Sequence, residues 1–211
     1  MNNANKDIST ILEKLEEMYP YAHCELNFNS NFELLVAVIL SAQCTDKRVN
    51  IVAHELFKKY NKPEDFANMP LEELESLIKP CGFYKNKAKN IQNCSKQLIE
   101  KFNGEVPNSI DKLIALPGVG RKTANVVMAE AFKESAIAVD THVLRVSNRI
   151  GFISSKDPLK VEQKLMKIIP KEKWIRAHHL LIFLGRYKCF ARKPECSSCK
   201  IKEYCKMGRN K

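Results

Sequence analysis

Apolar residues recur along most of the chain at the three- and four-residue spacing that places them on one face of a helix. The first such run contains Ile8, Ile11, Leu12 and Leu15. The same spacing predicts further helices at about 32–42, 49–60, 71–78, 87–102, 110–116, 124–132, 141–150, 158–169 and 174–184. No segment shows the sustained alternation of apolar and polar positions that a strand requires. The sequence therefore predicts an all-α fold.

Two helix starts also carry local signals. Ser30 and Glu33 have the spacing of a capping box ahead of the apolar segment 32–42. Pro70 stands where a first-turn proline is favoured, ahead of the segment 71–78. There is no repeat, low-complexity stretch or long linker, so we expect one compact unit or two closely packed lobes.

One tight turn lies between the two predicted helices 110–116 and 124–132. It reads Leu116-Pro117-Gly118-Val119-Gly120-Arg121-Lys122-Thr123. Glycines allow left-handed backbone and let a ligand approach without meeting a Cβ atom. The N–H groups of the following helix would point at that ligand with the positive end of the helix dipole behind them. This helix-hairpin-helix suits a nucleic-acid backbone, and an ordinary inter-helix turn is the alternative.

The charge balance favours a polyanionic partner. The chain has 35 Lys and Arg against 24 Asp and Glu, a net charge of +11. Binding to nucleic acid would release counterions and weaken as salt rises. A charge excess can also serve solubility alone.

The eight cysteines form two populations. Cys24, Cys44, Cys81 and Cys94 are scattered among apolar residues, and we expect them to be small buried hydrophobes. The other four are crowded near the C-terminus with the spacing Cys189-x6-Cys196-x2-Cys199-x5-Cys205. Four thiolates can hold a zinc ion or an iron–sulfur cluster. Spacing favours the cluster, because structural zinc sites usually pair two short knuckles and this segment has only one.

The N-terminal residues do not resemble a secretory signal, since 1–6 contain no apolar core. The longest apolar run, 34–40, is too short to span a bilayer. We therefore expect a cytoplasmic protein whose thiols stay reduced. We also expect the first helix to return beside the cysteine segment.

Four features together resemble the endonuclease III family of the helix-hairpin-helix superfamily. They are the hairpin 116–123, the segment Val139-Asp140-Thr141-His142, the segment Ser41-Ala42-Gln43 and the four-cysteine tail. The resemblance covers essentially the whole chain. It implies two helical lobes, one formed by 24–135 with the helix-hairpin-helix at about 110–129, the other by 1–23 and 136–211. It also implies a four-iron four-sulfur cluster on Cys189, Cys196, Cys199 and Cys205.

The resemblance implies a base-excision-repair enzyme as well. Such an enzyme removes oxidised or damaged pyrimidines from double-stranded DNA and cleaves the abasic site by β-elimination through a lysine Schiff base. The family's catalytic positions fall on Lys122 and Asp140. Its DNA contacts fall on Gln43, which enters the space left by the flipped base, and on Phe83. From the hairpin itself we expect DNA contacts at Leu116, Gly118, Gly120 and Arg121, and from the loop tethered by Cys189 and Cys196 we expect one at Lys193. We expect a monomer associated with the nucleoid and not with a membrane.

The chemistry can be argued from the residues themselves. A base in a duplex must be flipped out before its sugar C1′ can be attacked. Lys122, beside Arg121 at a helix N-terminus and partly desolvated in a cleft, is placed to react as a neutral amine. Asp140 precedes an apolar-periodic segment, so we expect it to cap a helix and also to stabilise positive charge on the sugar. His142 is expected to be a structural hydrogen-bonding residue.

Several alternatives remain at this stage. Phe83 stands where a wedge residue, often leucine, is expected, and it could equally be a core aromatic. Cys44 replaces the small residue expected beside Gln43, which bears on lesion preference. An adenine-mismatch glycosylase would lack a lysine at the position of Lys122, whereas a thymine-mismatch or uracil glycosylase would keep the same fold. A DNA-binding module with a structural zinc is the alternative that is not an enzyme.

Overall fold

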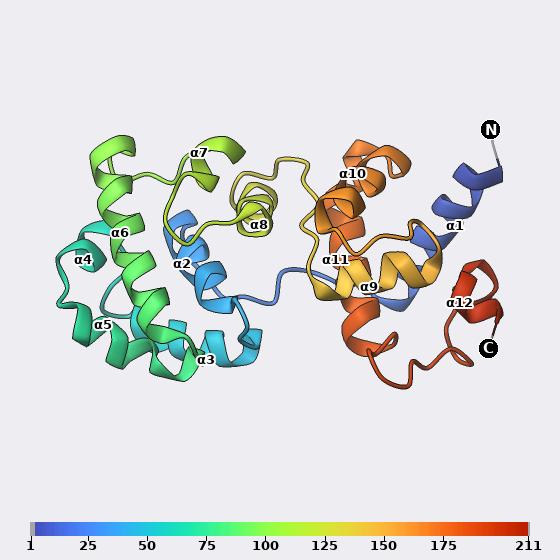
Figure 1. The fold of residues 1–211 in the computed structure, drawn as a ribbon, viewed down its shortest axis with the longest axis horizontal. Helices are drawn as coiled ribbons and strands as arrows, with labels where there is room; N and C mark the ends of the chain where they lie inside the picture. The colour runs from blue at the N-terminus through green and yellow to red at the C-terminus, as the bar shows by residue number, and fades with distance from the viewer. Residues whose placement is uncertain (1–2, 211) are drawn as a thin grey trace. The chain divides into compact units, whose positions relative to one another are not determined.

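The computed structural model describes residues 3–210, and these residues form helices and connecting segments with no strand among them (Figure 1). The all-α expectation is confirmed. The helices are α1 (Asn3–Met18), α2 (Asn31–Ser41), α3 (Asp46–Phe57), α4 (Pro63–Asn68), α5 (Leu71–Ile78), α6 (Tyr84–Phe102), α7 (Ile110–Ile114), α8 (Arg121–Ala131), α9 (Thr141–Ile150), α10 (Pro158–Ile168), α11 (Trp174–Tyr187) and α12 (Lys206–Arg209), with 3-10 turns η1 (Lys79–Cys81), η2 (Lys171–Lys173) and η3 (Lys202–Tyr204).

The chain divides into two compact units. The hairpin unit is Glu25–Glu134 and contains α2 to α8. The cysteine unit comprises the described residues of Met1–Cys24 and Ser135–Lys211 and contains α1 and α9 to α12. The first helix thus belongs to the same unit as the C-terminal cysteines.

Helix α2 is the centre of the hairpin unit. Every residue from Phe32 to Leu40 is buried, because this helix is apolar on all sides and packs against α3, α6 and α8. Its N-cap is Ser30, whose hydroxyl accepts a hydrogen bond from the Glu33 N–H at 3.1 Å. The Glu33 carboxylate accepts from the backbone N–H of Asn29 at 2.6 Å. The capping box is therefore half formed, with its return bond shifted by one residue.

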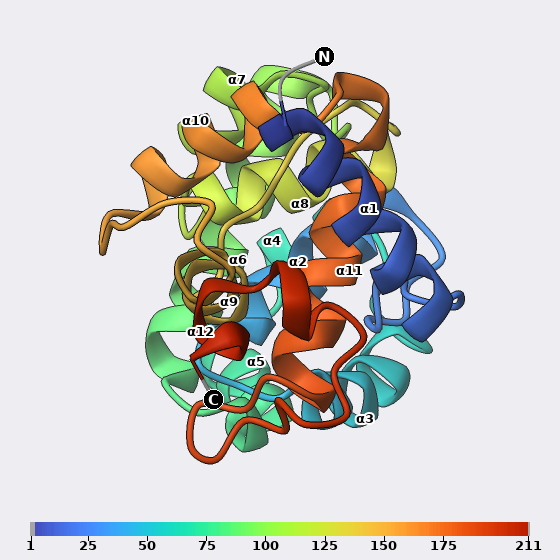
Figure 2. The ribbon, with the colours of Figure 1, turned by 90° about the vertical axis from the view of Figure 1, so that its right-hand side faces the viewer.

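The cysteine unit is built on α9 and α11, which pack together around residues such as Val143, Val146 and Leu181. Helix α1 lies beside α11 (Figure 2). It also reaches the C-terminal segment, where Lys200 pairs with Glu17 at 3.0 Å. The expected return of the first helix to the cysteine segment is therefore confirmed.

The helix bounds follow the sequence closely where the apolar repeat is long. Helices α5 and α9 begin and end at the predicted residues, and α6 starts three residues early at Tyr84. The short helices α4 and α12 were not predicted, because four to six residues are too few to show a period. No described helix is both long and apolar enough to cross a membrane.

Candidate active site and metal centre

The hairpin between α7 and α8 depends on one glycine. Gly118 has φ of +79°, a conformation that side-chain-bearing residues rarely adopt. A Cβ atom there would lie 2.8 Å from the Cβ of Asn90 on α6. The turn is closed by a hydrogen bond from the Val119 N–H to the Leu116 carbonyl at 3.1 Å. Both the backbone conformation and the packing therefore require glycine at position 118.

Gly120 plays a different part from the one expected. Its backbone is extended, with φ of −88° and ψ of 174°, and it is the N-cap of α8. The expectation that both glycines supply left-handed backbone was therefore wrong for Gly120, because an N-cap residue is normally extended. A Cβ atom at Gly120 would meet nothing within 4 Å. The first turn of α8 is accordingly open to an approaching anion.

Apolar side chains fix the hairpin to its unit. Leu116 is 3 % exposed and Val119 is 5 % exposed. Leu116, one of the DNA contacts inferred from sequence, thus has its side chain in the core.

Arg121 and Lys122 form the first turn of α8 and are both exposed. Both residues are therefore accessible to a ligand, and the partial desolvation of Lys122 stays a prediction. The lysine stands at the positive end of the helix dipole, two residues beyond the open Gly120.

Gln43 and Phe83 share an unusual backbone. Both have positive φ, 52° for Gln43 and 46° for Phe83, and both are exposed. Phe83 is 65 % exposed, so the alternative of a core aromatic is wrong. Non-glycine residues in this conformation are uncommon and often occur at functional sites. Two of the candidate DNA contacts are therefore presented to solvent on strained backbone.

Lys87 braces the segments that carry these two residues. Its side chain is buried, and its ammonium donates to the Leu40 carbonyl at 2.8 Å and to the Cys81 carbonyl at 2.7 Å. Burial lowers the pKa of Lys87. The ammonium thus joins the end of α2, just before Gln43, to η1, just before Phe83. Nothing in the periodic pattern pointed to this brace.

Asp140 is the N-cap of α9, as expected. Its Oδ1 accepts from the Val143 N–H at 2.8 Å, and its carbonyl accepts from the Leu144 N–H at 2.9 Å. The side chain is half-buried, and the cap engages one of the two carboxylate oxygens. The cap thus fixes the carboxylate at the start of α9.

His142 is on α9 and packs against α11. Its Nδ1 lies 3.3 Å from Arg145 Nη2, and a Cβ atom at Gly185 would lie 2.8 Å from the His142 Cβ. These contacts agree with the structural role expected from the sequence.

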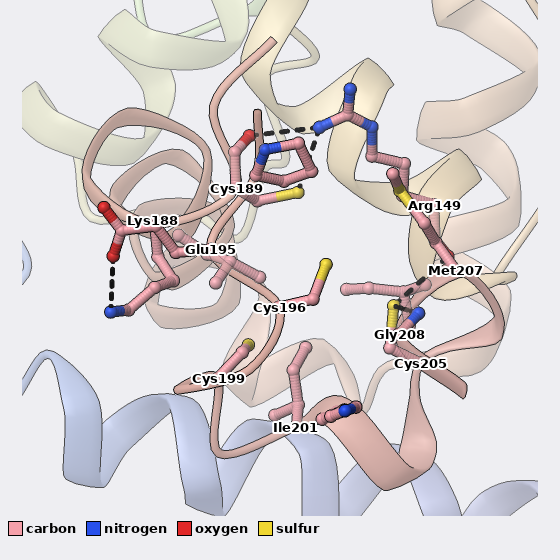
Figure 3. Close-up of a pocket in the computed structure, with 14 residues that line it drawn as sticks. Arg149, Lys188, Cys189, Glu195, Cys196, Cys199, Ile201, Cys205, Met207 and Gly208 are labelled. Carbon is pink, nitrogen blue, oxygen red and sulfur yellow. Dashed lines mark hydrogen bonds and ion pairs between the residues drawn. The ribbon is translucent and has the colours of Figure 1, made fainter. Parts of the chain in front are cut away.

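The four C-terminal cysteines line one pocket in the cysteine unit (Figure 3). The space among its lining residues is about 370 Å³, part of it open to solvent, and Ile150, Leu184 and Ile201 form part of its apolar wall. Within the described part of the chain, no three His, Cys, Asp or Glu side chains are arranged to hold a single metal ion.

The thiols in this pocket are held in place by the backbone. Gly208 donates from its N–H to Cys205 Sγ at 3.4 Å, and a Cβ atom at Gly208 would lie 2.7 Å from the Lys202 carbonyl oxygen. Burial raises the pKa of both Cys199 and Cys205. Four soft sulfur donors facing an apolar pocket fit an iron–sulfur group.

Two arginines of α9 bind the start of the cysteine segment. Arg145 donates through Nη2 to the Gly185 carbonyl at 2.8 Å and to the Cys189 carbonyl at 3.2 Å. Arg149 donates to Cys189 Sγ at 3.3 Å, a contact drawn in Figure 3. Burial and the neighbouring charge of Arg149 lower the pKa of Arg145. The cysteine segment is therefore fastened to the helix that Asp140 caps.

Lys193 lies in the loop between the first two cysteines. It is exposed and has φ of 51°. An ion pair of 2.9 Å between Lys188 and Glu195 closes the base of this loop. The loop therefore presents Lys193 to solvent from a fixed base.

The helical fold is that of the helix-hairpin-helix DNA repair proteins. Residues 36–171 match the model of the HhH-GPD superfamily of base excision DNA repair proteins. The chain is 54 % identical to endonuclease III of Bacillus subtilis (strain 168) over 98 % of this chain and 94 % of that protein. It is 48 % identical to endonuclease III of Escherichia coli (strain K12), over 97 % and 96 % of the two chains.

The comparison with solved structures points to the same family. A trapped covalent intermediate of endonuclease III with DNA superposes with a TM-score of 0.94 at 54 % identity, covering 100 % of this chain and 99 % of that one. A thermostable thymine-DNA glycosylase, with a TM-score of 0.88 at 24 % identity and full coverage of both chains, shares the fold. The chain belongs to the endonuclease III family. It is thus a base-excision-repair enzyme, a DNA glycosylase for damaged pyrimidines that is also an abasic-site lyase.

Proposed function

We propose that Lys122 is the nucleophile of this glycosylase and lyase, and that the hairpin binds the DNA backbone beside it. The observation that carries the proposal is the position of Lys122 in the first turn of α8, behind the open N-cap Gly120. The N–H groups of that turn are suited to a phosphate, with Arg121 adding charge. The covalent DNA intermediate of the endonuclease III relative supports a nucleophile in this family fold.

The flipped nucleotide would be replaced by two exposed side chains. Gln43 enters the space that the base leaves, and the Phe83 ring wedges or stacks between neighbouring bases. Their exposure and positive φ support these roles. Flipping costs a few kcal/mol and costs least for a damaged base that stacks poorly.

The bound DNA also prepares the nucleophile. Lys122 is exposed in the free protein. When DNA covers the first turn of α8, it removes water from the ammonium group, and Arg121 disfavours a second positive charge beside it. The Asp140 carboxylate helps to take up a proton from Lys122, and the neutral amine attacks C1′.

The reaction then proceeds in two stages. The Lys122 nitrogen forms a bond to C1′ while the bond from C1′ to the base breaks, and the departing base takes up a proton. The sugar ring opens to an iminium ion, whose acidified C2′ proton is removed as the 3′ phosphate leaves by β-elimination. The Asp140 carboxylate stabilises the positive charge that develops on the sugar, as carboxylates do in glycoside cleavage.

We assign a four-iron four-sulfur cluster to Cys189, Cys196, Cys199 and Cys205. The four thiols that line one apolar pocket support this assignment. The cluster would cross-link the cysteine segment and stabilise the loop that carries Lys193, which we place on a DNA phosphate. Iron analysis of the purified protein should give about four irons per chain with visible absorption. One zinc and no iron would instead support the structural-zinc alternative.

The remaining assignments follow from this activity. The partner is double-stranded DNA that carries a damaged base, and the enzyme works as a monomer with the chromosome in the cytoplasm. The hairpin unit supplies the helix-hairpin-helix and the cysteine unit supplies Asp140 and the cluster.

Borohydride trapping tests the nucleophile. The wild-type protein, incubated with duplex that contains an abasic site, should become covalently attached to the DNA when borohydride reduces the iminium. Lys122→Ala should bind this duplex without trapping, and cleavage should fall by several orders of magnitude. Loss of one phosphate contact would instead cost about tenfold. Lys101→Ala, an exposed lysine at the end of α6, is the matched control and should trap normally.

Substrate choice is tested with the same protein. Duplexes that contain thymine glycol, uracil, a thymine opposite guanine or an adenine mismatch are incubated under single-turnover conditions. Thymine glycol should be cleaved fastest.

Trapping and cleavage by Lys122→Ala at wild-type levels would refute the proposed mechanism.

A further inference from the structure

Two further thiols lie together in the hairpin unit, which does not contain the metal-centre cysteines. Cys44 follows α2 and Cys81 ends η1, and the Cys81 thiol is hydrogen-bonded to Cys44. Cys81 is buried, whereas Cys44 is partly exposed. The expectation that all four scattered cysteines are buried was therefore wrong for Cys44, and also for Cys24. The difference arises because Cys44 lies in a surface turn between two helices and not within an apolar helix face.

The surroundings of the pair favour oxidation at Cys44 before Cys81. Burial, with the charge and hydrogen bond of Cys44, raises the pKa of Cys81 to about 11. Lys87 places positive charge near both sulfurs, and Arg48 adds positive charge near Cys81. Cys44 is the more exposed of the two thiols, so a small oxidant reaches it first. Cys44 is thus placed as the attacking thiol and Cys81 as its partner.

The pair also joins the two segments that we assign to base recognition. Cys44 follows Gln43 directly, and Cys81 precedes Phe83 by two residues. The brace from Lys87 to the carbonyls of Leu40 and Cys81 already holds these segments together through hydrogen bonds. A covalent bond between the sulfurs would fix the same two segments more tightly.

We propose that Cys44 and Cys81 form an oxidation-sensitive pair, which a small peroxide converts to an intrachain disulfide that joins the Gln43 and Phe83 segments. The Cys44 thiolate attacks one oxygen of hydrogen peroxide, the O–O bond breaks, and hydroxide leaves to become water. The Cys81 thiol then attacks the sulfur of the Cys44 sulfenic acid, and its proton leaves with the hydroxyl as a second water. Two thiols are oxidised by two electrons, and one peroxide is reduced to two waters.

The bond would reduce binding of DNA, a consequence that rests on the proposed roles of Gln43 and Phe83. The two sulfurs must approach from hydrogen-bond contact to about 2.05 Å, which draws the segments together. Gln43 and Phe83 must enter the duplex on either side of the flipped nucleotide. A fixed, shortened separation opposes that entry, so the oxidised protein should bind a lesion more weakly. A thiol reductant would restore binding.

Peptide mapping tests the bond itself, independently of any DNA. The full-length protein is treated with a few equivalents of hydrogen peroxide, its free thiols are alkylated, and it is digested with trypsin without reduction. The expected product is a cross-link between peptides 15–47 and 60–85. Because Cys24 shares the first peptide, the experiment is repeated in Cys24→Ser, which should retain the cross-link. Cys44→Ala and Cys81→Ala should abolish it, and its absence from the wild type overturns the proposal.

Binding to a duplex that contains a tetrahydrofuran abasic analogue tests the consequence. Peroxide should weaken binding of Cys24→Ser at least fivefold, and dithiothreitol should reverse the loss. Cys44→Ala should keep its affinity in peroxide, since it retains the metal-centre cysteines but lacks the pair. An equal loss in Cys44→Ala, or an intact affinity in the cross-linked protein, would refute the effect on binding. Failure of the reduced protein to cleave a lesion would refute the proposed function instead, and leave the mapping result unaffected.

Discussion

Arg149 donates a hydrogen bond from Nη1 to the carbonyl oxygen of Phe190 at 2.6 Å. The same guanidinium group donates through Nη2 to the Ala191 carbonyl at 2.9 Å. One arginine of α9 thus holds the backbone of the loop between the first two cysteines. Because Asp140 caps α9, this helix connects the candidate catalytic carboxylate to the candidate metal centre.

Replacement of Arg149 should loosen that loop. Arg149→Met keeps much of the apolar stem but removes the bonds to Phe190 and Ala191, a loss of roughly 1–3 kcal/mol for hydrogen bonds from a charged group. We expect trypsin to cut after the exposed Arg192 several times faster than in the wild type. Arg209→Met, an exposed arginine in α12 of the same unit, is the control and should leave the cleavage rate unchanged. Equal rates in Arg149→Met and wild type would contradict the restraint inferred for Arg149.

The two hairpin glycines should respond differently to alanine. Gly118→Ala forces a side chain into left-handed backbone and against Asn90, so we expect a loss of about 1–3 kcal/mol in the free energy of unfolding. Gly120→Ala meets open space on an extended backbone and should cost about 1 kcal/mol or less, as a weaker N-cap. Urea denaturation gives both values.

Gly120→Ala should impair DNA binding even though it costs little stability. The methyl group of Gly120→Ala would stand before the N–H groups that we assign to a phosphate, so the folded variant should bind duplex DNA at least fivefold more weakly. Unchanged affinity in Gly120→Ala would place the phosphate elsewhere.

The local pattern predicted the elements but not the contacts that join them. Helix α9 appears at its predicted bounds because Val143 and Val146 repeat at helical spacing after a capping aspartate. The brace at Lys87 could not be predicted, since its acceptor Leu40 lies 47 residues away in sequence. The sequence also placed Leu116 among the DNA contacts, where the core holds its side chain. A hairpin motif identifies a turn but does not say which of its side chains face inward.

Lys193 should contribute to DNA affinity without regard to sequence or damage. If its ammonium contacts a phosphate, Lys193→Ala should weaken binding to damaged and intact duplex alike, and reduce the salt slope of log K by about one unit. Lys164→Ala, an exposed lysine on α10, should leave the slope unchanged. A full slope in Lys193→Ala would make Lys193 a solvated surface charge.

Asp140→Asn should separate the chemistry of Asp140 from its role in the fold. An amide oxygen can still accept from the Val143 N–H, so the cap and the unfolding free energy should stay within about 0.5 kcal/mol of wild type. An uncharged amide cannot stabilise positive charge on the sugar, so single-turnover base removal should fall by roughly 10²–10³. Asp157→Asn is the matched control, because Asp157 caps α10 through a bond from the Leu159 N–H at 2.9 Å and is assigned no part in the reaction. It should keep both stability and activity, and wild-type base removal by a stable Asp140→Asn would leave Asp140 as a helix cap alone.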